Sequence, residues 1–191
     1  GTALAVDARC FYPNAMNEIS PERPRIRLLP KRHRRVKQGH PWIYSNEIAL
    51  SDATRALAPG ALATFDNAAG ETLGCGFFNP KPLVVGRMLS TAADLRVDAT
   101  FFQNRFRKAL ALRDRLYPKP FYRLIHAEAD GLPGMIVDRY GDVLVVQLNA
   151  AGPAACSAMI IEALQAVFAP RGILVRSDAA ARSVEGVEAS P

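Results

Sequence analysis

Short apolar runs interrupted by glycine dominate the first half of the chain. The segments RIRLLP, ALATFD, ETLGCGFF and LVVGRMLS are rich in β-forming residues, and several such strands at close spacing are typical of a small β-barrel. Between the first two lies KRHRRVKQG, which predicts a short basic helical turn that ends at Gly39.

The hydrophobic period changes between residues 90 and 97. From Val97 to Tyr117 the apolar positions recur at three- and four-residue spacing, which predicts one amphipathic helix, and Pro118 and Pro120 end it. Three basic residues, Arg105, Lys108 and Arg115, fall on the side away from the apolar stripe.

The second half reads as strands and helices in turn. YRLIHAE, GMIVDRY and VLVVQLN predict three strands, Ala154 to Phe168 predicts a second helix, and GILVRSD predicts a fourth strand. This order predicts an antiparallel or mixed sheet with helices on one face. The fold class is therefore α+β, with a disordered leader at 1–24, a β-barrel domain at 25–92 and a small α/β domain at 97–187.

The net charge of +6 is concentrated in one segment. Between Glu22 and Lys37 there are eight basic residues and one acidic residue, a charge of +7, so the remaining 16 basic and 17 acidic residues sum to −1. A concentrated positive patch attracts a polyanion, whereas dispersed charge mainly aids solubility. A plain solvated charge run is the alternative explanation.

Cysteines and hydropathy indicate the compartment. The three cysteines, Cys10, Cys75 and Cys156, show neither zinc-site spacing nor the even count of a disulfide framework, so we expect a cytoplasmic protein with buried structural thiols. No apolar run is long enough to span a bilayer, and the first residues do not resemble a signal peptide; we expect no membrane partner.

The stretch EADGLPGMIVDRYGD, residues 128–142, is the most chemically suggestive segment. Glu128, Asp130 and Asp138 would form a metal-dependent hydrolase site if they converged, but DG and GD are also turn signals, and we favour turns whose aspartates bind backbone amides. Neither a phosphate-binding glycine loop nor a histidine cluster is present, so we expect no catalytic, metal or cofactor site in this chain.

Basic residues followed by aromatic residues are typical of RNA binding. Arginine and lysine neutralise phosphates, and rings such as Trp42, Tyr44, Phe77 and Phe78 offer faces for unstacked bases, although each ring is also a candidate for the core. The predicted RNA-binding residues are Arg25, Arg27, Lys31, Arg32, Arg34, Arg35, Lys37 and Trp42.

Four blocks in order carry a family resemblance. GHPWIYSNEI (39–48), GFFNPK (76–81) leading into VVGRML (84–89), AEADGLPGMIVDRYGD (127–142) and RSDAAARSVEG (176–186) resemble the RlmI-type large-subunit ribosomal RNA cytosine-5 methyltransferases. The resemblance implies an N-terminal PUA domain, a small RNA-binding pseudobarrel, followed by a central α/β domain. It also implies a C-terminal Rossmann-like domain that binds S-adenosylmethionine and supplies a catalytic cysteine, and no such domain is recognisable in this sequence.

Two functional hypotheses follow. In the first, the chain is the substrate-recognition part of an RNA methyltransferase, truncated before its catalytic domain, with ribosomal RNA as its partner and S-adenosylmethionine used only by the full-length parent. In the second, it is a non-enzymatic PUA-type scaffold that binds RNA or the ribosome. The sequence does not indicate the oligomeric state or the target nucleotide.

Overall fold

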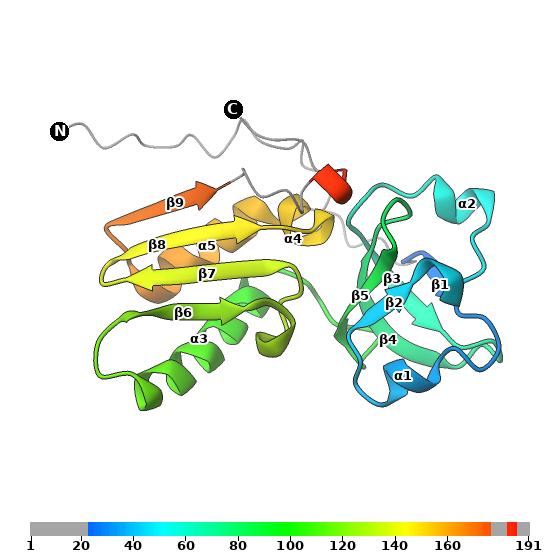
Figure 1. Cartoon of the computed structure of the whole chain (residues 1–191), viewed down its shortest axis with the longest axis horizontal. Coiled ribbons are helices and arrows are strands. Elements are labelled where there is room, and N and C mark those ends of the chain that lie inside the picture. The colour runs from blue at the N-terminus through cyan, green and yellow to red at the C-terminus, as the bar shows by residue number, and fades with distance from the viewer. Residues whose placement is uncertain (1–22, 177–182, 187–191) are drawn as a thin grey trace.

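The computed structural model describes residues 23–176 and 183–186, so the predicted leader lies almost wholly outside the described residues. Figure 1 shows two lobes side by side, one built from each sheet.

The first lobe is a curled five-stranded sheet. Its strands run in the order β1-β3-β4-β5-β2, with β1 parallel to β3 and the other neighbours antiparallel. An isolated bridge between Leu28 and Ile48 joins the chain beyond β1 to the chain beyond β2, so the two edges of the sheet approach each other. The strands are β1 Arg25–Arg27, β2 Trp42–Tyr44, β3 Ala61–Asp66, β4 Thr72–Phe78 and β5 Val84–Ser90.

Short helical turns connect these strands. The predicted basic turn is α1 Arg34–Lys37, and it is followed by Gly39 at φ +88°, a conformation that glycine adopts without strain. The others are η2 Ser45–Glu47 and α2 Asp52–Arg55.

Glycines in β4 permit close contact between strands. A Cβ at Gly76 would lie 2.1 Å from the backbone oxygen of Arg87, and one at Gly74 would lie 2.1 Å from that of Ser90. These residues therefore serve strand packing within the sheet and form no phosphate-binding loop.

The second lobe is a four-stranded mixed sheet in the order β6-β7-β8-β9, with only the β8–β9 pair parallel. Helices α3 and α5 lie together on one face of it (Figure 1), as the alternation of elements predicted. The elements are α3 Ala99–Leu116, β6 Phe121–His126, η3 Ala127–Asp130, β7 Met135–Tyr140, β8 Val143–Leu148, α4 Ala151–Ala155, α5 Ser157–Phe168 and β9 Gly172–Arg176.

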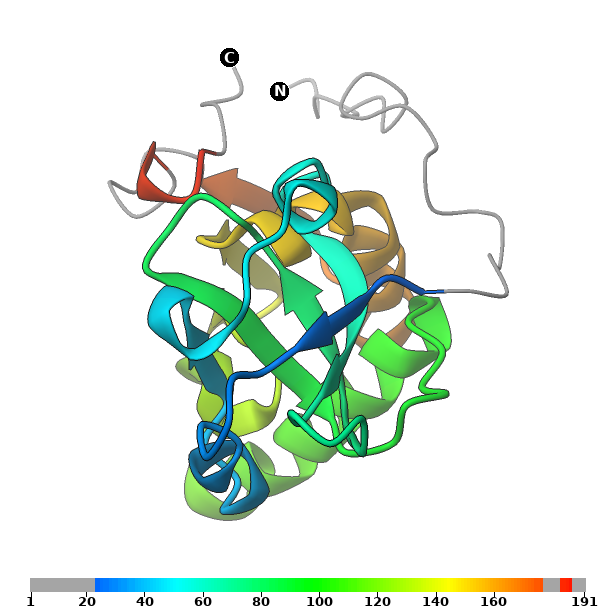
Figure 2. The same cartoon turned by 90° about the vertical axis from the view of Figure 1, so that its right-hand side faces the viewer.

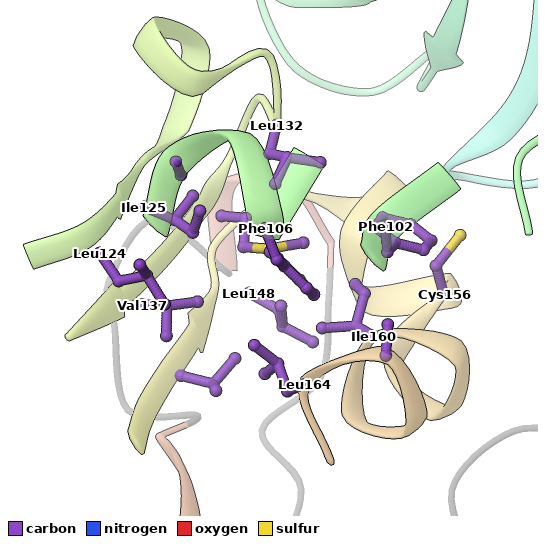
Figure 3. Packing of buried hydrophobic residues seen from close by; sticks show 14 of the residues in the cluster. Phe102, Phe106, Leu124, Ile125, Leu132, Val137, Leu148, Cys156, Ile160 and Leu164 are labelled. Atoms are coloured by element: carbon purple, nitrogen blue, oxygen red, sulfur yellow. The ribbon is translucent and has the colours of Figure 1, made fainter. Parts of the chain in front are cut away.

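Helix α3 follows its sequence pattern closely. Asp98 caps it by accepting a hydrogen bond from the backbone N–H of Phe101 at 2.8 Å, and Tyr117, which precedes Pro118, is extended and ends it. Phe102 and Phe106 on the predicted apolar stripe are buried against α5 and the sheet, where Figure 3 shows them facing Ile160 and Leu148.

The second predicted helix is wrong in its limits. The helical segment begins at Ala151 rather than Ala154, and Cys156 divides it into α4 and α5. Gly152 in α4 lies so close to Phe77 of β4 that a Cβ would be 2.1 Å from the ring. This tertiary contact, which the sequence pattern does not reveal, joins the two lobes in one core.

Candidate nucleic-acid interface

Four of the predicted RNA-binding cations are exposed on the segment of the first lobe that runs from β1 to α1. Arg27 lies on β1, Lys31 and Arg32 lie in the turn before α1, and Arg34 opens α1. Among residues 23–176 and 183–186, none of the four has an acidic side chain as an ion-pair partner. We call these four residues the α1 patch.

The fold positions the α1 patch by burying alternate residues. Ile26 and Leu28 are buried on either side of Arg27, and Val36 anchors α1 to the same core. Lys31 has a positive φ of 66°, which turns the chain from β1 into α1. The apolar residues that interrupt the basic run thus fix its cations on a folded surface, as the interleaving predicted.

Three other predicted cations are engaged by side chains of the fold. Arg25 makes a two-pronged contact with Asp66, with distances of 2.8 and 2.7 Å, and Asp66 itself is buried. Lys37 lies 3.4 Å from Glu71, whose pKa is lowered by hydrogen bonds from Asn67 and Lys37. These contacts give Arg25 a structural role.

Arg35 is also held within the fold. Its guanidinium lies 3.4 Å from the buried Glu47, contacts the His40 ring, and packs over the Tyr44 ring at 4.9 Å. The backbone N–H of Trp42 donates to Nδ1 of His40 at 3.2 Å, so His40 stabilises the turn before β2. This cluster orders the loop that leads into β2.

Trp42 faces the second lobe. Its indole N–H donates to Oε1 of Glu128 at 2.7 Å, and Arg87 lies 5.9 Å from its ring centroid. The other aromatic candidates are divided: Phe77 and Phe78 are buried, whereas Tyr44 is half-buried beneath Arg35. Trp42 is therefore a contact between the lobes, and any role with RNA would be in addition to that.

Arg87 connects three parts of the chain. It donates to Glu128 at 3.3 Å and to Glu185 at 2.7 Å, and Glu185 also accepts from the side chain of Asn79 and the backbone N–H of Ala151. Only 6% of the Glu185 side chain is exposed. Sequence reasoning missed this network, because no periodicity places a glutamate near the C-terminal end inside a junction between two sheets.

Each of the three carboxylates considered for a metal site is bound by a different arginine. Glu128 binds Arg87, Asp130 binds Arg113 at 2.7 Å, and Asp138 binds Arg123 at 2.8 Å. In the described part of the chain, no group of three or more His, Cys, Asp or Glu side chains is placed to hold a metal ion.

The turn interpretation of Asp130 is confirmed, although the connection differs in form. Asp130 accepts from the backbone N–H of His126 at 2.7 Å, and the segment is the 3-10 helix η3 that ends at Gly131 with φ +70°, rather than a tight hairpin. Asp142, by contrast, contacts Arg171 at the surface.

The two described cysteines do not have the properties of nucleophiles. Cys75 and Cys156 are both buried, and burial raises the pKa of each thiol, that of Cys156 to about 12. Nucleophilic cysteines need a lowered pKa. Cys10 lies outside the described residues.

No helix in the described segments combines the length and the apolar character needed to cross a membrane.

The five-stranded lobe corresponds to a known family of domains. Residues 26–91 match the family model of PUA-like domains. Over 168 residues the chain is 38% identical to ribosomal RNA large subunit methyltransferase I of Shewanella denitrificans, and over 167 residues it is 34% identical to that of Escherichia coli. These alignments cover 85% and 86% of this chain, and the chain spans about 42% of the length of each relative.

The resemblance predicted from the four blocks is therefore confirmed: this chain is related in sequence to the RlmI-type ribosomal RNA large subunit methyltransferases over most of its length. Solved structures agree in fold. A putative SAM-dependent methyltransferase from Streptococcus mutans has a TM-score of 0.66 at 18% identity, with 80% of this chain and 41% of that chain covered. A putative methyltransferase complexed with SAH has a TM-score of 0.67, also at 18% identity, with 80% of this chain and 40% of that chain covered.

Proposed function

We propose that this chain is the RNA-binding, substrate-recognition part of a SAM-dependent ribosomal RNA cytosine-5 methyltransferase that acts in the cytoplasm. The proposed division is a PUA-like pseudobarrel at 25–92 and a central α/β domain at 97–187, with a Rossmann-like catalytic domain outside this sequence. The observation that carries the proposal is the α1 patch, four exposed cations without acidic partners among the described residues, in a domain that matches the PUA-like model.

In this proposal, methyl transfer takes place in the Rossmann-like catalytic domain and not in the two domains of this chain. The glycines of β4 are closed in by strand backbone, and the described cysteines are buried thiols with raised pKa values, so neither feature fits a cofactor loop or a nucleophile. In this proposal S-adenosylmethionine supplies the methyl group in the full-length parent. The residues of this chain bind and orient the RNA.

The physical mechanism is neutralisation of phosphates. Each phosphate contact to a single strand contributes about 0.7 to the slope of log K against log salt concentration, so four contacts in the α1 patch predict a slope of about −3. Arg25 and Arg35 contribute less in this scheme, because their guanidinium groups already bind carboxylates of the fold.

Fluorescence anisotropy with a labelled fragment of large-subunit ribosomal RNA, titrated at several salt concentrations, tests the proposal. We expect the double variant Arg32→Glu/Arg34→Glu to lose at least tenfold in affinity and to have a shallower salt dependence. The single variant Arg34→Glu should also bind more weakly than the wild type. Arg55→Glu on α2, which makes the same charge change as Arg34→Glu elsewhere on the first lobe, is its matched control. Wild-type affinity that is independent of salt, or equal effects of Arg34→Glu and Arg55→Glu, would refute the assignment.

A further inference from the structure

We propose that the RNA-binding surface continues along helix α3 of the second lobe and ends at a tyrosine platform that stacks an unpaired base. This inference rests on the proposed function and extends it from the α1 patch to a second site.

The first observation is the charge on the exposed side of α3. Arg107, Lys108 and Arg115 are exposed there, and Lys119 continues the series beyond the helix. Arg107 contacts only the neutral side chains of Gln103 and Asn104. Within the described residues, none of the four has an acidic ion-pair partner.

One basic residue of the predicted face has a different role. Arg105 turns inward, donates to the backbone oxygen of Leu89 and packs over the Phe101 ring at 5.4 Å, so it joins α3 to the first lobe. The exposed cations therefore begin at Arg107 and extend toward the C-terminal end of the helix.

Helix α1 and the C-terminal half of α3 lie on the same, lower side of the molecule in Figure 1 and Figure 2. In this proposal the exposed cations of α3 continue the surface of the α1 patch. A helix of 18 residues is about 27 Å long, which gives an extended strand several phosphate positions along α3.

The second observation is a hollow at the end of α3. It has a volume of about 500 Å³ and is lined by Asp114, Tyr117, Lys119, Tyr122, Arg139 and neighbouring apolar residues. Tyr117, with 47% of its surface exposed, stacks on Tyr122 with centroids 5.2 Å apart and an interplanar angle of 30°.

The buried ring of Tyr122 is held in place by its neighbours, so the exposed ring of Tyr117 that stacks on it forms a rigid platform. The hydroxyl of Tyr122 accepts from Arg139 at 3.1 Å and contacts Asp114 at 3.3 Å, and Arg139 packs against Phe168. A ring that is already oriented loses little entropy when it stacks on a base. Among the described residues that line the hollow, Asp114 is the only acidic one, and it accepts a hydrogen bond from the Tyr122 hydroxyl. The ammonium group of Lys119 has no acidic partner among these residues and is available for a phosphate.

A nucleic acid matches this combination better than a protein partner does. An aromatic platform flanked by unpaired cations is the arrangement that binds single strands, where stacking acts on the base and charge acts on the backbone. Stacking of this kind requires a base free of a helix, so the site selects unpaired RNA over duplex RNA.

Tyr117→Leu is the decisive variant, because it keeps apolar cover over Tyr122 and removes the aromatic face. We expect a loss of roughly 5- to 100-fold in affinity for a short unstructured RNA, with an unchanged salt slope since no charge is altered. Tyr117→Phe should bind like the wild type. Tyr140→Leu is the matched control, since Tyr140 is another exposed tyrosine that does not line the hollow.

Lys108→Glu/Arg115→Glu tests the helix face separately. This variant should weaken binding and reduce the salt slope, whereas Tyr117→Leu should weaken binding and leave the salt slope unchanged. Circular dichroism establishes that each variant is folded.

The two proposals fail in distinguishable ways. If the Tyr117 and α3 variants bind like the wild type while Arg32→Glu/Arg34→Glu is weakened, the second site is refuted and the proposed function stands. If the wild type binds no RNA at low salt, the proposed function fails. A preference of the wild type for duplex RNA, unaffected by Tyr117→Leu, would refute the platform.

Discussion

Replacing Arg87 tests whether the two lobes are stabilised as one unit. The guanidinium is the cation between Glu128 and Glu185, and its side chain is 16% exposed, against 24% and 6% for the two carboxylates. Arg87→Ala therefore leaves both carboxylates without their shared cation. Among the described residues, the donors that remain to them are neutral, namely the Trp42 indole, the Asn79 amide and one backbone N–H.

The expected loss is a large part of the total stability. Breaking a buried ion pair by removing one partner costs about 3–5 kcal/mol, and the remaining donors to Glu185 place this case near 3 kcal/mol. A domain has only about 5–15 kcal/mol in total. The exposed pair between Arg171 and Asp142, with side chains 78% and 62% exposed, predicts less than about 1 kcal/mol for Arg171→Ala.

Urea denaturation followed by far-ultraviolet circular dichroism measures both values. The double variant Arg87→Ala/Glu185→Ala should cost less than the sum of the single variants, with a coupling of about 0.5–3 kcal/mol. A midpoint for Arg87→Ala equal to that of Arg171→Ala, or strictly additive single variants, would show that the network does not stabilise the junction.

Two further predictions concern the second lobe. Asp130→Ala removes the ion-pair partner of Arg113, whose side chain is 9% exposed, and should lower the free energy of unfolding by about 3 kcal/mol. Adding Arg113→Met to Asp130→Ala should restore part of the lost stability, because the unpaired buried charge is then removed. No recovery in the double variant would contradict the ion-pair explanation. The raised pKa of Cys156, about 12 against an ordinary value of 9.0, means that its contribution to stability is complete below pH 9 and is lost as the pH rises from 9 towards 12. The free energy of unfolding of the wild type should therefore fall by about 1 kcal/mol more between pH 8 and pH 10 than that of Cys156→Ala. An equal fall in the two proteins would show that the Cys156 thiol is not the cause.

The sequence predicted elements wherever a local pattern was sufficient. Apolar spacing and the prolines that follow it located α3 within two residues, and the glycine after the basic run located the end of α1 within two residues. The helical turn before Ala154 was missed, and it packs through Gly152 on Phe77, a contact between residues 75 positions apart that no local pattern reveals.

The candidate site was predictable in composition but not in detail. Charge counting found the basic segment, yet it could not separate Arg34, which is exposed, from Arg35, whose guanidinium binds Glu47 and lies over Tyr44. That difference depends on which side of a four-residue helix faces the lobe. The exposure of Tyr117 was missed for a similar reason, since the pattern counts its ring with the apolar stripe, whereas the ring is half exposed beyond the helix end.

Trp42 gives the molecule a built-in optical probe. It is the sole tryptophan of the sequence, and its indole bridges the two lobes through Glu128. Indole emission depends on the polarity and hydrogen bonding around the ring, so the intrinsic fluorescence of this chain reports on the junction specifically. A change in emission on adding RNA would register a shift between the lobes without any label attached to the protein.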